Sequence, residues 1–198
     1  LDRDLLRKTT SVAGETLMDH RAVAATFNAC FETRFRTVMV GGAIEPLYIP
    51  PSPSSLGKLR YREDYAASAL HEAAHWCIAG TDRRQRLDFG YAYTPPPRDP
   101  RAQAAFFAGE ARTQALESIF AEAACVRFAL SIDDLESLDR RPECSEAFAA
   151  GVELERQRVN RQLEARRLRR AARFAAALAG KSDGLLGVGR TCDGRTHG

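Results

Sequence analysis

The sequence has no run that approaches the roughly 18 consecutive apolar residues of a membrane-spanning helix. Its first ten residues, LDRDLLRKTT, are charged and lack the apolar segment of a secretory signal. A strong charge of one sign is also missing, since the net charge is only +3, which is too small to indicate nucleic-acid binding. With ordinary apolar and charged fractions, the 198 residues are expected to form one soluble domain without a membrane partner.

Paired cysteines are missing as well. The five cysteines are Cys30, Cys77, Cys125, Cys144 and Cys192, and no CxxC occurs. An odd number at wide spacing argues against a disulfide framework and against a cysteine-rich zinc site. Cys77 and Cys125 stand among apolar residues, so we expect both to be small buried hydrophobic side chains. The expected location is the reducing cytoplasm.

Composition divides the chain into three parts. Residues 1–20 are mixed and polar and are expected to form a loosely ordered leader. Residues 21–180 should form a single metal-dependent domain. Residues 181–198 contain five glycines and are expected to be a flexible tail.

Helices are expected to dominate this domain. They are predicted over 21–35, 64–79, from Asp99-Pro100 to about 130, over 131–138 and over 143–179, and short strands over 37–40, 45–49 and 86–93. Asp64 and Gly80 are the expected caps of the helix over 64–79. Gly41-Gly42 should stop the first strand, and Gly109 could divide the helix that follows Pro100. This pattern predicts the α+β class with a small β-sheet.

The segment SALHEAAHWCIAG at 68–80 contains the pattern His-Glu-x-x-His. Residues four apart lie about 400° around a helix axis, so His71 and His75 share one face and can bind one metal ion. Glu72 projects about 100° away, where hydrolytic zinc enzymes place a general base. The pattern also arises by chance on helices whose histidines are ordinary surface or core residues. Because two of only four histidines fall on this one capped helix, we favour a metal site.

Two histidines do not complete a catalytic metal site, which needs a third protein ligand. His20 and His197 lie in the terminal segments and are poor candidates. A carboxylate from another element is better, and the sequence offers Glu110, Glu117, Glu122 and Asp88. Glu110 and Glu117 are seven residues apart and share a helix face, although a solvated surface is the usual place for any glutamate. Ligand type alone does not separate zinc from iron.

Four blocks occur in an order that resembles the bacterial elongation factor P hydroxylase family. They are FNACF (27–31), EPLYIP (45–50), YAASALHEAAHWCIAG (65–80) and DFGYAY (88–93). Zinc peptidase chemistry does not require Trp76, Cys77 or Gly80, so the flanks of the histidine pair carry the resemblance. It spans roughly residues 21 to 130 and continues more loosely to about 179.

This resemblance implies a non-haem Fe(II) enzyme that uses molecular oxygen to hydroxylate a lysine of elongation factor P. That lysine would already carry a β-lysyl group. Residues 21–180 would be a single hydroxylase domain on a scaffold similar to that of zincin metallopeptidases. By position, the metal ligands would be His71, His75 and Glu110. Two imidazoles and one carboxylate leave coordination positions open for oxygen chemistry at Fe(II).

Glu72 is the residue whose catalytic role differs between the two possible enzyme classes. In the alternative function, a cytoplasmic zinc metallopeptidase, Glu72 would be the general base. In an oxygenase it could hold a metal-bound water, orient a ligand or bind the ammonium groups of the substrate. Glu72 and Asp88 are the candidates for binding those amines. Tyr91 and Tyr93 could line the substrate channel, although alternating strand residues more often belong to the core.

Residues 153–173 carry eight arginines and three glutamates, with a broken apolar stripe. One interpretation is a solvated helix with many charge pairs. The functional interpretation is a helix that docks an acidic protein, here elongation factor P, by long-range attraction. Direct nucleic-acid binding is a weaker interpretation, since no aromatic residue is interleaved with these arginines.

Overall fold

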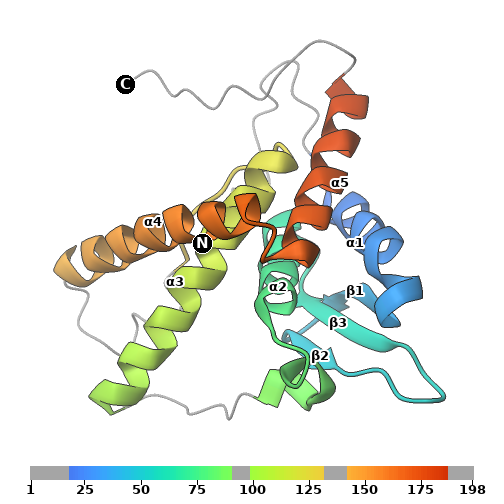
Figure 1. Cartoon of the computed structure of the whole chain (residues 1–198), viewed down its shortest axis with the longest axis horizontal. Coiled ribbons are helices and arrows are strands. Elements are labelled where there is room, and N and C mark those ends of the chain that lie inside the picture. The colour runs from blue at the N-terminus through green and yellow to red at the C-terminus, as the bar shows by residue number, and fades with distance from the viewer. Residues whose placement is uncertain (1–17, 91–98, 132–141, 187–198) are drawn as a thin grey trace, which may run out of the picture.

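The computed structural model describes residues 18–90, 99–131 and 142–186, which together form a helix-dominated α+β fold, as predicted (Figure 1). Its elements, in chain order, are α1 (His20–Phe35), β1 (Thr37–Ala43), β2 (Leu47–Ile49), β3 (Gly57–Arg62), α2 (Ala66–Ile78), the 3₁₀ helices η2 (Arg83–Gln85) and η3 (Leu87–Gly90), α3 (Pro100–Ala123), α4 (Pro142–Glu164) and α5 (Arg169–Leu186). Of the helices in these ranges, none is long and apolar enough to cross a membrane.

The three strands form one mixed sheet in the order β1-β3-β2. β1 runs parallel to β3 and β2 runs antiparallel to it, with Met39 and Tyr48 both paired with Leu59. Burial alternates strictly along β3, so that Gly57, Leu59 and Tyr61 face the helices. β3 was not predicted, although buried residues and exposed basic residues alternate along it with the period of two that is typical of a strand.

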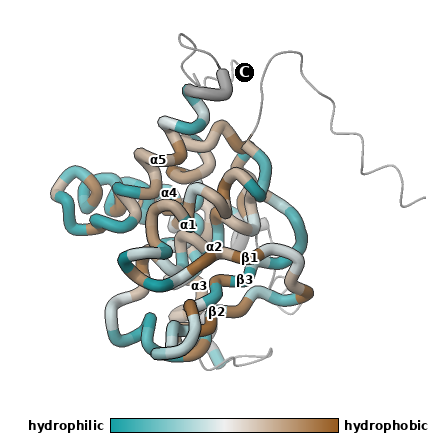
Figure 2. Tube along the Cα trace, turned by 90° about the vertical axis from the view of Figure 1, so that its right-hand side faces the viewer, coloured by the Kyte–Doolittle hydropathy of each residue, from teal (hydrophilic) through white to brown (hydrophobic). Residues whose placement is uncertain are grey.

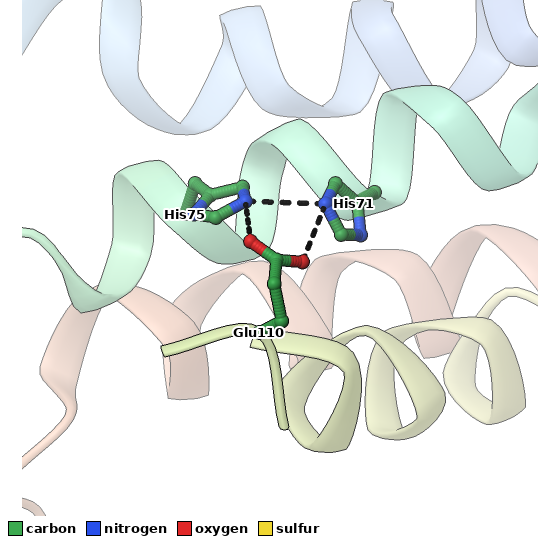
Figure 3. A group of neighbouring side chains, drawn as sticks. All are labelled: His71, His75 and Glu110. Carbon is green, nitrogen blue, oxygen red and sulfur yellow. Dashed lines mark hydrogen bonds and ion pairs between the residues drawn. The ribbon is translucent and has the colours of Figure 1, made fainter. Parts of the chain in front are cut away.

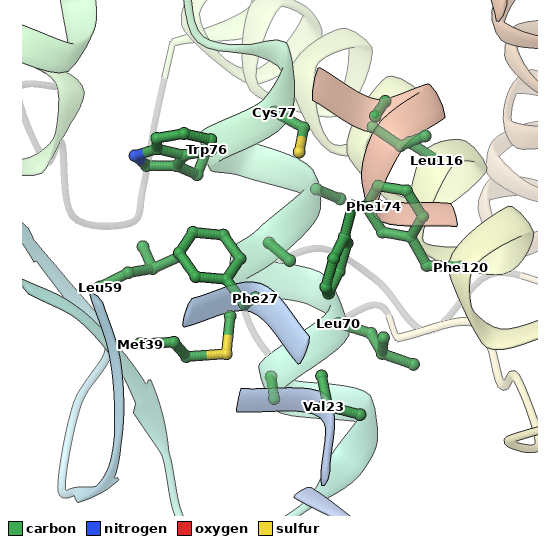
Figure 4. Packing of buried hydrophobic residues seen from close by; sticks show 14 of the residues in the cluster. Val23, Phe27, Met39, Leu59, Leu70, Trp76, Cys77, Leu116, Phe120 and Phe174 are labelled. Carbon is green, nitrogen blue, oxygen red and sulfur yellow. The ribbon is translucent and has the colours of Figure 1, made fainter. Parts of the chain in front are cut away.

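Helix α2 lies at the centre of the fold, in contact with α1, β3, α3 and α5. Its Trp76 is fully buried and packs edge-on against Phe27, which Phe174 of α5 also contacts (Figure 4). Phe35 packs edge-on against the same indole ring. Figure 2 shows the hydrophobic segments gathered where α1, α2 and the strands meet. Each such aromatic pair adds about 0.5–1.5 kcal/mol beyond the area it buries. The helix that carries His71 and His75 is therefore held in place by the core on several sides.

The structure revises the predicted caps of α2. Tyr65, not Asp64, is the N-cap residue, and Asp64 instead lies 3.5 Å from the Nδ1 of His20. At the other end Ala79, not Gly80, is the C-cap residue. Two guanidinium groups replace the glycine cap: Arg84 donates to the carbonyl of Ala79, and Arg170 donates to the carbonyls of Cys77 and Ala79. Side chains of η2 and α5 thus donate to the terminal carbonyls of α2, which in many helices accept backbone N–H groups from the turn around a left-handed glycine.

Three further boundaries differ from the predictions. β1 continues through Gly41-Gly42, where Gly42 has a φ of 73° and the register to β3 shifts. α3 is continuous through Gly109. The helix predicted over 143–179 is two helices, separated near Arg166, whose φ is 55°. The arginine-rich segment 153–173 is therefore not one helix.

The strand predicted over 86–93 was wrong in its described part. Leu87–Gly90 is a 3₁₀ turn in which Asp88 and Phe89 have left-handed φ values of 46° and 56°. The spacing of Leu87 and Phe89, two residues apart, is typical of a strand. Here, however, Phe89 packs against Tyr48, and this tertiary contact favours the turn. Residues 91–98 and 132–141 lie outside the described ranges, and with them Tyr91, Tyr93 and most of the short helix predicted over 131–138.

At the termini of the described region, Met18 is buried and the carboxylate of Asp19 caps α1. At the other end α5 extends to Leu186, into the predicted tail. Cys77 is buried as expected. Cys125 is not: it is partly exposed and is disulfide-bonded. A turn with φ of 51° at Cys125, after the end of α3, explains why it leaves the core.

Candidate metal centre

The imidazoles of His71 and His75 project from α2 toward the carboxylate of Glu110 on α3 (Figure 3). The two Nε2 atoms are 3.1 Å apart. The carboxylate of Glu110 places one oxygen 3.6 Å from the Nε2 of His71 and the other 3.4 Å from the Nε2 of His75. One donor atom from each of the three residues lies within 4.8 Å of the others. Three donors converge on one point, as a metal ion requires.

The second nitrogen of His71 is held by another carboxylate of α3. Its Nδ1 lies 2.8 Å from an oxygen of Glu117, which is almost fully buried. A donor hydrogen on Nδ1 leaves the lone pair on Nε2, the atom that points toward Glu110. Glu117 had been weighed as a metal ligand, but this geometry makes it the group that orients a ligand.

Burial by itself would lower the pKa of His71. The hydrogen bond and charge of Glu117, with smaller contributions from Glu72 and Glu110, outweigh it and raise that pKa to about 9. For Glu110, burial alone would raise the pKa. The neighbouring imidazoles of His75 and His71 outweigh burial and hold the pKa of Glu110 below its usual value. Both shifts record a cluster in which cationic and anionic groups stabilise each other.

His75 is flanked by Thr113 and Phe89. The hydroxyl of Thr113 lies 3.4 Å from the Nδ1 of His75 and donates to the carbonyl of Gly109 at 3.0 Å. The ring of Phe89 stacks over His75 with centroids 6.5 Å apart, and its other neighbour is Tyr48 at 4.5 Å. Polar contact on one side and aromatic contact on the other restrict the rotation of this imidazole.

Spacing on α3 explains how one helix serves both histidines. Glu110, Thr113 and Glu117 stand at i, i+3 and i+7, which is one helix face. The sequence analysis noted this relation for Glu110 and Glu117 but missed Thr113. The signal was available, because a metal-binding histidine nearly always donates its other nitrogen to a nearby acceptor.

Glu72 is buried beside the cluster, with a relative exposure of 9%. Burial raises its pKa, His75 and His71 act in the opposite direction, and Asp88 and Glu110 add to the increase. Asp88 of η3 is thus among the charges that act on Glu72. Within the described residues, Glu72 makes no hydrogen bond.

Asp88, whose charge acts on Glu72, has an unusual backbone conformation. It and Phe89 are consecutive non-glycine residues in the left-handed region, a conformation that costs about 1–2 kcal/mol for most residues. Arg83 donates to the carbonyl of Phe89 at 3.1 Å and helps to fix the turn. Strain of this kind is typical of positions where a side chain must point at a site.

The remaining candidates lie elsewhere. Glu122 is exposed and forms an ion pair with Arg156 of α4, and the Nδ1 of His20 is 2.8 Å from the hydroxyl of Tyr61. Tyr91 and Tyr93 are outside the described residues.

The donor chemistry at this point fits a metal ion. Two imidazole nitrogens and one carboxylate are a recurrent ligand set for Fe(II) and for zinc, and neither histidine has to change its helix face to supply it. Glu117 and Thr113 supply the outer hydrogen bonds that such ligands need. The arrangement can therefore hold a divalent cation near a further buried carboxylate, Glu72, on which the charge of Asp88 also acts.

Comparison with known proteins gives a family match and a named relative. The sequence profile of the family described as elongation factor P hydroxylase matches residues 26–183 of this chain. A protein of Haemophilus influenzae named elongation factor P lysine hydroxylase is 40% identical over 121 residues. This alignment covers 60% of the present chain and 68% of the relative. The family match contains every residue of the candidate metal centre.

Proposed function

The chain belongs to the elongation factor P hydroxylase family, and from this membership we propose that it hydroxylates a lysine side chain of elongation factor P. The observation that carries the proposal is the convergence of His71, His75 and Glu110 within the matched segment. Because the substrate is a translation factor, a cytoplasmic place of action follows from this function.

The proposed metal is Fe(II), held by His71, His75 and Glu110, with molecular oxygen as cosubstrate. When bound, such an ion would supply the activation of oxygen that C–H hydroxylation requires. Overall, one atom of O₂ is inserted into a C–H bond to give C–OH, and the other leaves as water. The reaction consumes two electrons from an external reductant, together with two protons. Support comes from the ligand set, which the two-histidine helix α2 and the neighbouring helix α3 bring together.

The proposed substrate is the lysine that already carries a β-lysyl group, whose amines are cationic. Two carboxylates are the proposed partners of these amines: Glu72, which is buried and interacts electrostatically with both imidazoles, and Asp88, whose charge acts on Glu72. Their charges would attract and orient the ammonium groups. Tyr91 and Tyr93 follow Asp88 in the chain and are proposed to line the channel.

The protein itself positions the imidazoles. Glu117 accepts from His71 and so holds its Nε2 as the free donor, while Thr113 contacts the Nδ1 of His75. The buried ring of Phe89 stacks on one side of His75. These contacts would hold the cluster in one arrangement before the substrate arrives.

The proposal is tested with elongation factor P that carries the β-lysylated lysine. Incubated with iron-loaded protein, a reductant and ¹⁸O₂, the substrate should gain one labelled oxygen atom, as measured by mass spectrometry. His71→Ala and Glu110→Gln should abolish the gain. Glu122→Gln, an exposed carboxylate on the same helix, is the matched control and should retain it.

Absence of a labelled product with iron, oxygen and reductant present would overturn the proposed function. The zinc peptidase has a distinct signature in the same preparation: zinc at full occupancy and peptide cleavage that is lost in Glu72→Gln. Metal analysis of anaerobically purified protein separates the two outcomes before any substrate is added.

A further inference from the structure

One face of the β-sheet carries cations and aliphatic side chains together. Burial alternates along the strands, so that every second side chain points away from α1 and α2 and lies on the outer face of the sheet. This outer sheet face consists of Val38, Val40, Leu47, Ile49, Lys58, Arg60 and Arg62. All seven are exposed or partly exposed, and the helices that contact the sheet lie against its other side.

Two of the three cations of the outer sheet face, Lys58 and Arg60, lack an ion-pair partner among the described residues. β1, β2 and β3 contain no acidic residue. Within the described residues Lys58 and Arg60 form no ion pair, while Arg62 reaches the exposed Glu63 at 3.8 Å. Side chains two apart on one strand are separated by roughly 7 Å, so three positive charges in a row repel one another. An anionic partner would relieve that repulsion.

Strand register places two of the three cations between aliphatic groups. Lys58 lies between Val38 of β1 and Ile49 of β2, and the next outward position repeats the arrangement with Arg60 between Val40 and Leu47. A partner that fits this face therefore offers carboxylates in a line with apolar groups on both sides.

That chemistry favours a protein over a nucleic acid. The outer sheet face has no aromatic side chain on which bases could stack. It does have the mixture of apolar contact and complementary charge that is typical of protein interfaces.

The edge strand of the sheet also connects it to the metal centre, through a side chain on the opposite, buried face. β2 is an edge strand that contacts η3, and Tyr48 of β2 stacks on Phe89. Phe89 in turn stacks on His75, and the charge of its neighbour Asp88 acts on Glu72. A protein seated on the sheet would thus border the segment that leads to the proposed site.

We propose that the outer sheet face docks an acidic surface of the protein substrate. The identity of that substrate rests on the proposed function. The arginine-rich segment is less suited to this task, because several of its arginines are occupied. Arg156 binds Ser118 and Glu122, Arg158 pairs with Glu155, and Arg170 caps α2.

The test compares two triple charge reversals of equal charge change. The first is Lys58→Glu/Arg60→Glu/Arg62→Glu on the outer sheet face. The matched control is Arg161→Glu/Arg167→Glu/Arg169→Glu, three exposed arginines of segment 153–173. Circular dichroism and metal content establish that both variants are folded and loaded. Binding to β-lysylated elongation factor P is measured by calorimetry at two salt concentrations, and turnover is measured separately.

The sheet variant should bind the protein substrate at least about tenfold more weakly, with a reduced salt dependence, and its KM should rise in parallel while kcat is unchanged. A short peptide that carries the same modified lysine should be hydroxylated equally by all three proteins, because it does not reach the sheet. The control variant should bind and turn over the protein substrate like the parent.

Unchanged binding by the sheet variant, or a loss only in the control variant, would overturn the docking proposal while leaving the hydroxylase function intact. A second outcome is a parent protein that binds the factor without turnover and a sheet variant that does not bind it. This outcome would overturn the proposed function and keep the docking surface. A parent that neither binds nor modifies the factor overturns both. A defect confined to binding of a single-stranded RNA probe would overturn the choice of a protein partner.

Discussion

Glu117 offers the sharpest test of how the site is built. It contributes no donor to the proposed metal, yet its oxygen lies 2.8 Å from the Nδ1 of His71 and its side chain is almost fully buried. Glu117→Gln keeps an acceptor of similar shape and removes the charge, whereas Glu117→Ala removes both. Loss of such an outer hydrogen bond typically weakens metal binding by about 10–100-fold, or roughly 1.4–2.7 kcal/mol.

We therefore expect metal affinity in the order parent, Glu117→Gln, Glu117→Ala, with the alanine variant near the hundredfold end. The assay titrates metal-free protein with zinc in competition with a chromophoric chelator, which measures the ligand set whichever metal acts in catalysis. Because the metal-free fold also loses a buried hydrogen bond, its free energy of unfolding should fall by about 1–3 kcal/mol. Chemical denaturation of the metal-free variants measures this separately.

The matched control is Glu122→Gln, an exposed carboxylate on the same helix, whose metal affinity should equal that of the parent. Suppose that Glu117→Ala binds zinc within a factor of two of the parent while remaining folded. The hydrogen bond to His71 would then have no part in orienting the ligand, and the account of the centre as two imidazoles held by α3 would be wrong.

Three further predictions concern other parts of the fold. Asp88→Gly should raise the free energy of unfolding by about 0.5–1 kcal/mol in urea denaturation, because glycine adopts the left-handed φ without strain, while the KM for modified substrate increases. Arg170→Met removes the charge-assisted hydrogen bonds that end α2 and should lower stability by about 2–3 kcal/mol, whereas exposed Arg158→Met should change it by no more than about 0.5 kcal/mol; equal effects would contradict the capping role. Leu116→Ala, in the core, should lower stability by about 2–5 kcal/mol, and half-exposed Leu154→Ala should stay within about 0.5 kcal/mol, both measured by thermal unfolding.

Helical spacing was the most informative signal in the sequence. His71 and His75 had to share a face of any helix that contained them, and the same reasoning linked Glu110 with Glu117 on α3. What spacing did not provide was the rotation of α3 about its axis relative to α2. That rotation decides which carboxylate meets the Nε2 atoms and which meets Nδ1, and it depends on packing between distant parts of the chain.

Local patterns failed where tertiary contacts decide the backbone. The alternation through Leu87 and Phe89 favoured a strand, but stacking of Phe89 on Tyr48 and the hydrogen bond from Arg83 hold a left-handed turn. Gly80 looked like a helix cap, but Arg170, ninety residues further along the chain, took that role. No glycine or proline marked the break near Arg166, so the division between α4 and α5 had no local signal.

The division of labour between α2 and α3 has a consequence for local opening of the protein. α2 supplies both imidazoles, and α3 supplies the carboxylate and both outer hydrogen bonds. A metal ion bound there would be a crosslink between two helices, broken whenever they separate. Opening of that interface would then become rarer as free metal rises, by a free energy of about 2.7 kcal/mol at a hundred times Kd. The protection of α3 amides from hydrogen exchange would follow the supply of metal, so the stability of this helix pair would report metal availability in the cell.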